Sequence, residues 1–187
     1  MQLNGVMNYN GGACDYGVKG LADDLYSAYN NPKISGIVIE TNSGGGEVSA
    51  GNALMSAVAD KNKPVLFHAH TMASSALKAG LPANEIIAAD PSSKIGSIGV
   101  FVSLNKKMIA DYTENVTDIY SEGSPNKNRE FRKLLLGDLS ELQKMVNKTD
   151  SYFKADVAKY RNLRGNDQRV NDTLSGDMFF APEAKSR

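Results

Sequence analysis

Residues 37–48 read Ile37-Val38-Ile39-Glu40-Thr41-Asn42-Ser43-Gly44-Gly45-Gly46-Glu47-Val48. The β-branched run at the start is typical of a buried strand in a parallel sheet that is covered on both faces. The three glycines end this strand, and a helical pattern follows them through Ala59. A buried strand that turns through glycine into a helix is typical of a βα unit, so an α/β fold is expected.

The same alternation extends in both directions from this stretch. A strand over Leu3–Tyr9 and a helix over Val18–Tyr29 are predicted before it. The segments predicted after it are strands at Pro64–Ala69, Glu85–Ala89, Ile98–Ser103 and Val116–Tyr120, short helices at Ala73–Leu81 and Lys106–Tyr112, a loop at Ser121–Arg132, and a long helix from Asp138 to about Leu163. One domain over residues 1–187 with a mostly parallel sheet is therefore expected.

The composition is that of an ordinary globular protein, with 41% hydrophobic and 22% charged residues. Basic and acidic residues both number 21, which gives no electrostatic reason to expect nucleic acid or an anionic membrane as a partner. The single Cys14 cannot form an internal disulfide and is expected to be a small buried filler. No export signal or membrane span is recognisable, so a soluble, cytoplasmic protein is expected, and the abrupt end after Ala181–Arg187 suits truncation of a longer protein.

The glycine run Gly44–Gly46 is the first candidate functional segment. Consecutive glycines let backbone N–H groups approach a ligand closely, either a phosphate or the oxyanion of an acyl-transfer reaction. The phosphate alternative requires a lysine and a hydroxyl directly after the glycines, and neither is present. A tight strand-to-helix turn without any ligand is the third interpretation.

Ser74 and Ser75 lie at the next strand-to-helix junction, within Thr71–Ala76. A serine in the first turn of a helix is near N–H groups that stabilise negative charge, which suits a nucleophile. The competing interpretation is an ordinary N-cap, because serine before an apolar helical run is the usual capping residue.

Two further segments and two histidines complete the candidates. Pro91–Val100 is rich in small residues and by itself predicts only a turn entering a strand. Lys127 lies in a polar loop, where a lysine is normally solvated; it can act as a base only if burial lowers its pKa. His68 and His70 alternate along one predicted strand with no obvious reach to the serines, and no spacing of ligand residues indicates a metal site.

Together these segments resemble the signal peptide peptidase A family of serine peptidases, in particular its short forms from phage head-assembly modules. The matching segments are Ile39–Val48 (N-S-P-G-G-x-V, with Gly44 for proline), Met72–Ala76 (M-A-A-S-G/A), Pro91–Val100 (P-S-S-x-x-G-S-I-G-V), Ile119–Asn128, the helix carrying Phe153, Val157 and Arg161 (F-x-x-x-V-A-x-x-R), and Gly176–Ala184 (G-x-x-F-x-A-x-x-A). The resemblance covers nearly the whole chain. It implies a ClpP/crotonase-like fold of repeated β-β-α units with a mostly parallel sheet and a long C-terminal helix.

The resemblance also implies a role for each matching residue. Ser75 is similar to the nucleophile, Lys127 to the lysine base and Ser97 to the serine that orients this lysine. Gly45 and Ala76 correspond to the two oxyanion-hole N–H donors. The double serine leaves Ser74 open as the nucleophile: the Met72–Ala73 and Pro91 anchors select Ser75 without a gap, whereas an anchor on Pro82–Asn84 selects Ser74 with one inserted residue.

The function implied is a serine endopeptidase with a Ser-Lys dyad, without a cofactor or metal, acting on peptide or protein substrates. Phage capsid maturation, in a prohead, and degradation of signal or membrane peptides are the settings that the resemblance suggests. Two alternatives remain: a catalytically inactive structural homologue, because Ser75 is followed by Ala76-Leu77-Lys78 rather than small residues and an aromatic, and a crotonase-type acyl-CoA enzyme. A cyclic homo-oligomer is expected, because relatives form rings and because the polar loop cannot bury Lys127 alone.

Overall fold

The computed structural model describes residues 1–12, 16–163 and 166–187, so the predicted filler Cys14 lies outside the described residues. The chain divides into two compact units. Unit 1 consists of Met1–Gly99 and Phe153–Arg187, and unit 2 consists of Val100–Tyr152.

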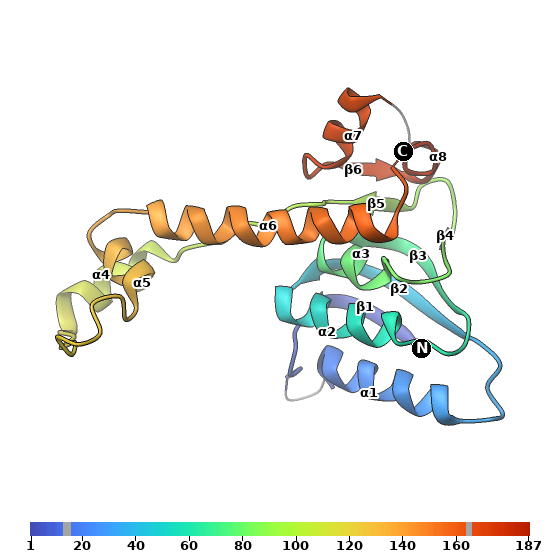
Figure 1. Ribbon diagram of the computed structural model, residues 1–187, viewed down its shortest axis with the longest axis horizontal. Coiled ribbons are helices and arrows are strands. Elements are labelled where there is room, and N and C mark those ends of the chain that lie inside the picture. The colour runs from blue at the N-terminus through green and yellow to red at the C-terminus, as the bar shows by residue number, and fades with distance from the viewer. Residues whose placement is uncertain (13–15, 164–165) are drawn as a thin grey trace. The chain divides into compact units, whose positions relative to one another are not determined.

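A six-stranded sheet forms the centre of unit 1 (Figure 1). Its strands are β1 (Gln2–Met7), β2 (Ile37–Gly46), β3 (Val65–Ala73), β4 (Glu85–Ala88), β5 (Lys94–Gly96) and β6 (Met178–Phe180). The order is β1-β2-β3-β5-β6, and β4 also pairs with β3. All pairs are parallel except β5 with β6, so the expected α/β class with a mostly parallel sheet is confirmed.

Helices α1 (Gly17–Asn30), α2 (Val48–Ala59) and α3 (Ser75–Gly80) cover one face of this sheet (Figure 1). Side chains along β2 and β3 alternate between buried and more exposed positions, so the core lies between the helices and a single sheet face. Ile39, Leu54 and Phe67 are fully buried there, whereas Val38 is 53% exposed on the opposite face. The prediction that this strand is covered on both faces was therefore wrong. A run of β-branched residues indicates a strand, but it does not indicate whether the second face of that strand is also covered.

Several predicted strands also differ from the structure. The strand β2 continues through the glycines, and Gly46 pairs with Met7 of β1 at a distance that leaves no room for a Cβ. No strand forms at Ile98–Ser103 or Val116–Tyr120. The strand near the first of these is β5, which ends at Gly96, where it is paired with β6 on one side and β3 on the other.

Unit 2 contains α4 (Lys106–Asn115), α5 (Arg129–Leu135) and the first part of α6 (Ser140–Tyr160). No residue of this fully described segment is buried. Its internal contacts include an edge-to-face pair between Tyr112 and Phe131, with ring centroids 5.0 Å apart, and ion pairs around Glu141.

The remaining elements belong to unit 1. They are the last part of α6, α7 (Asp167–Thr173) and α8 (Ala181–Lys185). Phe153 and Val157 of α6 are buried in the core of this unit. Among the described residues, no helix is long and apolar enough to cross a membrane.

Candidate active site

The turn between β3 and α3 carries both candidate nucleophiles. Strand β3 ends at Ala73, helix α3 begins at Ser75, and Ser74 joins them with φ 51° and ψ −122°. Such a conformation costs a non-glycine residue about 1–3 kcal/mol and persists only where the surroundings enforce it. The side chain of Ser74 makes no capping hydrogen bond to the helix. The ordinary N-cap interpretation therefore does not describe this serine.

The two serines differ in accessibility and in hydrogen bonding. Ser75 is 6% exposed, and its Oγ donates a hydrogen bond of 3.0 Å to the carbonyl oxygen of Gly46. A Cβ at Gly51 of α2 would lie 2.9 Å from the Cβ of Ser75, so glycine there allows α2 and α3 to approach each other at this point. Ser74 is half-buried, and its Oγ has no hydrogen-bond partner among the described residues. Ser74 is the more accessible residue of the two.

Gly45 contacts this turn directly. Its φ is +93°, and a Cβ there would lie 2.8 Å from the carbonyl oxygen of Ala73 and 2.9 Å from the backbone nitrogen of Ser75. The N–H of Gly45 donates to the Oγ of Ser43 at 3.1 Å, and Ser43 donates in turn to the carbonyl of Gly5. The glycine predicted for the oxyanion hole thus lies against the serine turn, with its N–H already bonded within its own segment.

Ser97 lies at the equivalent end of the neighbouring parallel strand. Ala73 of β3 is paired with Gly96 of β5, and the N–H of Ser74 donates to the carbonyl of Gly96 at 3.0 Å. The next residue along β5 is Ser97, which has φ 55° and donates its N–H to the carbonyl of Asp177 at 2.7 Å. The structure therefore brings Ser97 beside the Ser74–Ser75 turn, at the carboxyl ends of two adjacent strands.

The first turn of α3 supplies backbone donors at the same place. The first helical hydrogen bond runs from the N–H of Lys78 to the carbonyl of Ser74. The N–H groups of Ser75 and Ala76 therefore have no acceptor within the helix. Either one could donate to an oxyanion formed at the preceding serine.

Lys127 belongs to unit 2, whereas the serines and Gly45 belong to unit 1. It is exposed in the turn that precedes α5, and its N–H donates to the carbonyl of Ser124 at 3.0 Å. Ser74, Ser97 and Asn128, the neighbour of Lys127, are the only non-glycine residues with positive φ in the described part of the chain. Asparagine adopts this conformation more readily than serine, so the two serines are the stronger sign of imposed strain.

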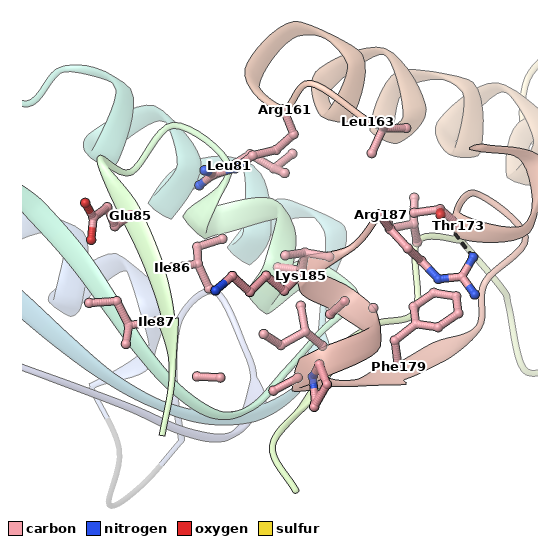
Figure 2. A pocket seen from close by; sticks show the side chains of 18 of the residues that line it. Leu81, Glu85, Ile86, Ile87, Arg161, Leu163, Thr173, Phe179, Lys185 and Arg187 are labelled. Carbon is pink, nitrogen blue, oxygen red and sulfur yellow. Dashed lines mark hydrogen bonds between the residues drawn. The ribbon is translucent and has the colours of Figure 1, made fainter. Parts of the chain in front are cut away.

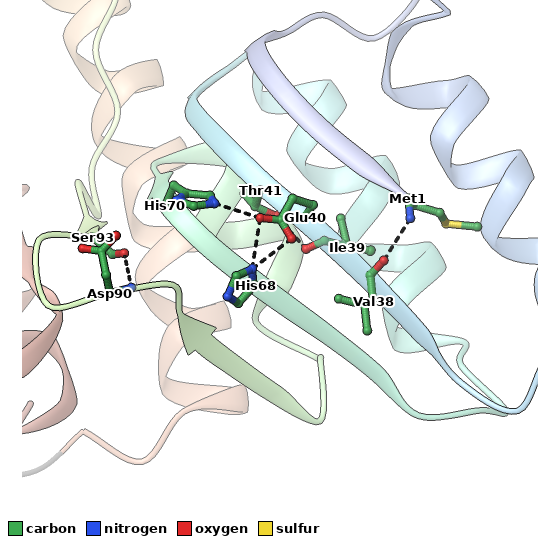
Figure 3. Close-up of polar contacts among 9 residues, drawn as sticks. All are labelled: Met1, Val38, Ile39, Glu40, Thr41, His68, His70, Asp90 and Ser93. Carbon is green, nitrogen blue, oxygen red and sulfur yellow. Dashed lines mark hydrogen bonds and ion pairs between the residues drawn. The ribbon is translucent and has the colours of Figure 1, made fainter.

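His68 and His70 point toward Glu40 (Figure 3). The Nδ1 of His68 lies 2.9 Å from a carboxylate oxygen of Glu40, and the Nε2 of His70 lies 2.8 Å from the other. These hydrogen bonds, from His68 first and then from His70, lower the pKa of the Glu40 carboxyl. The cluster lies on the sheet face opposite the helices, which explains why neither histidine reaches the serines. Sequence reasoning missed Glu40, although a glutamate on one strand and alternating histidines on the next could have indicated the cluster.

A second group that sequence reasoning missed joins α3 to α6. Lys78 is buried, its Nζ lies 3.1 Å from a carboxylate oxygen of Asp156, and it also lies over the ring of Phe153. Arg161 donates to the carbonyl of Gly80 at 2.9 Å, and burial lowers the pKa of its guanidinium. Lysine at this point of α3 is thus part of the packing of α6, which accounts for one departure from the family pattern.

A cavity of about 1030 Å³ lies within unit 1 beside this group (Figure 2). Its wall is mostly apolar and includes Leu81, Ile86 and Phe179, with Arg161 at one side. Leu77, close after the serine turn, and Ile98, directly after Ser97, also line it. Neither candidate nucleophile is among the lining residues, so the cavity adjoins the site without containing it.

Two sequence comparisons relate this chain to peptidases, and one of them names a family. The sequence profile described as "Peptidase family S49" matches residues 57–187, well over half of the chain. A relative from Methanocaldococcus jannaschii, named "Putative protease MJ0651", is 34% identical over 178 residues, which are 88% of this chain and 53% of the relative. This chain thus spans about half the length of that relative.

A solved structure gives an independent comparison of the fold. A mutant of the 1510-N membrane-bound stomatin-specific protease superposes with a TM-score of 0.63 at 15% sequence identity. The match covers 99% of this chain and 73% of the other. At this identity, the similarity supports the arrangement of helices and strands alone.

Proposed function

Since this chain belongs to peptidase family S49, we propose that it is a serine endopeptidase that hydrolyses peptide bonds of protein substrates within one domain over residues 1–187. The observation that carries the proposal is the strained Ser74, which lies against Gly45 and donates its N–H to Gly96, the residue before Ser97, at the carboxyl ends of adjacent strands. A sharp strand-to-helix turn that presents a hydroxyl, with N–H groups directly after it, is the arrangement that acyl transfer requires.

The nucleophile belongs to the Ser74–Ser75 pair. The ungapped alignment of sequence motifs predicts Ser75, with Ala76 supplying the oxyanion donor. The structure favours Ser74, because this residue has a strained positive φ at the strand-to-helix turn and because it is less buried than Ser75. In that case the N–H of Ser75 is the donor, and it lies against Gly45.

Labelling by a fluorophosphonate probe tests both the function and the residue. The wild-type chain is expected to react covalently, because the probe captures an activated serine. If Ser74 is the nucleophile, Ser74→Ala abolishes labelling and Ser75→Ala retains most of it; the reverse result returns the role to Ser75. Ser97→Ala is a third variant. It is expected to slow labelling, because Ser97 is predicted to orient the base, but not to abolish it, because the nucleophilic serine is still present. Absence of labelling in the folded wild type contradicts the proposal.

Lys127 is the proposed general base. A lysine with its ordinary pKa of about 10.4 is protonated near neutral pH, so the base must be desolvated before it can accept the hydroxyl proton. Lys127 is exposed in this single chain, and so a further surface has to cover it. Lys127→Ala is expected to reduce peptide hydrolysis by several orders of magnitude with an unchanged fold, whereas His68→Ala and His70→Ala change it little. Full activity of Lys127→Ala removes this lysine from the mechanism.

A neighbouring subunit is the proposed cover, within a cyclic homo-oligomer. Unit 2 has no buried residue, and it exposes large apolar side chains such as Ile119 and Leu136, which are 96% and 85% exposed. Association that buries such side chains would be favourable. Light scattering together with specific activity over a dilution series tests this, and activity is expected to fall as the oligomer dissociates. A monomer with full specific activity contradicts it.

An inactive, structural role is the second candidate. The exposed Lys127 and the burial of the Ser75 hydroxyl favour it in the single chain. A folded oligomer that neither reacts with the probe nor cleaves peptides would support this role. For an active enzyme, phage capsid maturation or degradation of signal peptides remains the proposed setting, and cleavage of candidate substrates by wild type but not by the Ser74→Ala/Ser75→Ala variant is the corresponding assay.

A further inference from the structure

Three potential metal ligands meet on the open face of the sheet, away from the serine turn (Figure 3). Glu40 of β2 and His68 of β3 are directly paired in the parallel register. The register then shifts between the Thr41 and Asn42 positions of β2, so His70 has no partner residue across the strand pair. A bulge of this kind re-aims a side chain, and here the imidazole of His70 turns to the same carboxylate that His68 contacts.

The atoms converge at distances that suit a shared ion. The Nδ1 of His68 lies 3.0 and 2.9 Å from the two carboxylate oxygens of Glu40, and the Nε2 of His70 lies 2.8 Å from one of them. One ligand atom from each residue falls within 4.8 Å of the others. Ligand atoms placed about 2.1 Å from one zinc ion are roughly 3.0–3.5 Å apart, so each imidazole nitrogen has to move away from its Glu40 oxygen by only about 0.5 Å to share an ion with it.

The donor set selects the class of metal. Two imidazole nitrogens and one carboxylate oxygen suit zinc and the neighbouring divalent transition metals, whereas magnesium and calcium prefer oxygen ligands only. The side chains of Glu40, His68 and His70 are 39%, 38% and 49% exposed, so an ion can reach them without any opening of the fold. The same exposure leaves room for water in the remaining coordination positions.

We propose that Glu40, His68 and His70 bind one divalent transition-metal ion, of which zinc is the representative, on the open face of the sheet. The ion joins β2 to β3 through side chains in addition to their backbone hydrogen bonds. A ligand that binds only the folded state stabilises it by mass action, so the metal raises the unfolding temperature. The site uses none of the residues assigned to peptide hydrolysis, and the inference therefore stands independently of the proposed function.

Isothermal titration of the full chain with zinc chloride, after treatment with a chelator, tests the proposal. One equivalent is expected to bind, with an accompanying rise in unfolding temperature. His70→Ala and Glu40→Gln are each expected to weaken binding at least tenfold, and His68→Ala/His70→Ala to abolish it. All titrations use a Cys14→Ser background, so that the only thiol of the chain cannot contribute. Circular dichroism checks that each variant is folded.

Glu85→Gln is the matched control, because it removes a carboxylate from the neighbouring strand β4 without touching the cluster. It is expected to bind zinc as the parent does. Two results overturn the proposal: no saturable binding at one equivalent, or equal affinity in the parent and in His68→Ala/His70→Ala. Equal weakening by Glu85→Gln and Glu40→Gln also overturns it, since that indicates a diffuse charge effect rather than coordination.

Discussion

Unit 1 and unit 2 both contain large apolar side chains but differ in whether those side chains are buried. Unit 1 contains every buried residue of the described chain, and its core extends from Leu3 in β1 to Phe179 in β6. Unit 2 contains none, although it includes strongly apolar side chains such as Phe101 and Ile119, which are 84% and 96% exposed. Conformational entropy opposes the ordering of both units, but only unit 1 offsets it by burial within itself.

Because unit 2 has no buried residue, its stability depends on weaker contacts than that of unit 1. The helices of unit 2 have polar contacts, including Lys107 with Asp111 and Lys133 with Asp138, but these pairs are exposed or half-exposed. Surface pairs of this type contribute about 0–1 kcal/mol each. Contributions of this size favour the helical conformation but are too small to stabilise unit 2 by themselves. Unit 2 is therefore expected to gain most of its stability from association with another surface.

The largest expected effect is a cavity in the core of unit 1. Phe67→Ala removes a fully buried ring and is expected to lower the free energy of unfolding by about 3–5 kcal/mol. Leu136→Ala, at a position 85% exposed, is expected to change it by less than about 0.5 kcal/mol in the dissociated chain. Urea unfolding of both variants measures the contrast. Similar losses for the two substitutions would show that unit 2 has a core of its own.

Glycines with positive φ in the two units provide the second contrast. Gly45→Ala combines backbone strain with contacts of 2.8–2.9 Å to the backbone around Ser75, and it is expected to cost about 2–5 kcal/mol. Gly137→Ala has φ +78° but no atom within 4 Å of the new Cβ, so only strain of about 1–2 kcal/mol is expected. Thermal unfolding compares them. Equal unfolding temperatures for Gly45→Ala and Gly137→Ala would contradict the close packing of Gly45 against the serine turn.

Ion pairs are expected to give a smaller difference in the same direction. Asp156→Asn leaves the ammonium of Lys78, whose side chain is 7% exposed, without its charged partner and is expected to cost about 1–3 kcal/mol. Lys107→Ala breaks an exposed pair in unit 2 and is expected to cost less than about 0.5 kcal/mol. Lys78→Met, which replaces the ammonium by an apolar group, should recover most of the loss when combined with Asp156→Asn. A double variant no more stable than Asp156→Asn contradicts this explanation.

The smallest effect concerns alkaline pH. Burial raises the pKa of Tyr29 to about 12, while the unfolded state keeps a value near 10, so the folded state holds this proton more tightly. The stabilisation is complete below pH 10 and is lost as the pH rises toward 12. Tyr29→Phe is expected to reduce this decline, at a cost of about 1 kcal/mol at neutral pH for the lost hydrogen bond to Ala57. Unfolding temperatures measured from pH 8 to 11 test this expectation. If the unfolding temperature of Tyr29→Phe falls with pH as steeply as that of the wild type, groups other than Tyr29 cause the decline.

Sequence patterns predicted the elements whose periodicity is local. The helices at residues 17–30 and 48–59 and the strands around Ile39 and Phe67 lie close to their expected positions. Patterns failed where structure depends on distant partners. Strand β5 forms at Lys94–Gly96 because β6, more than 80 residues later, pairs with it, and no local signal in Ile98–Ser103 reports this.

The candidate site shows the same division. Motifs located the segments of Gly45, Ser75 and Ser97, which meet at the ends of β2, β3 and β5. The strain at Ser74 and the bond from Gly45 to Ser43 depend on three-dimensional contacts, and spacing along the chain does not reveal them. The Glu40–His68–His70 cluster has a sequence signal in its alternating histidines, but the strand register that brings Glu40 to them is a three-dimensional feature. Because the roles of Ser75, Lys127, Ser97, Gly45 and Ala76 are not tested by these contacts, they stay predictions.

The bond from Ser97 to Asp177 has a consequence for the timing of biosynthesis. Residues 1–99 contain most of the sheet and can begin to fold while the ribosome is still adding the rest of the chain at about 5–20 residues per second. The loop at Ser97, however, is held by Asp177, and β5 is completed by Met178–Phe180. A nascent chain therefore has both serines long before the loop beside them is fixed. On the proposed function, the nascent polypeptide is expected to be unable to attack its neighbours, or itself, until Asp177–Phe180 have been synthesised.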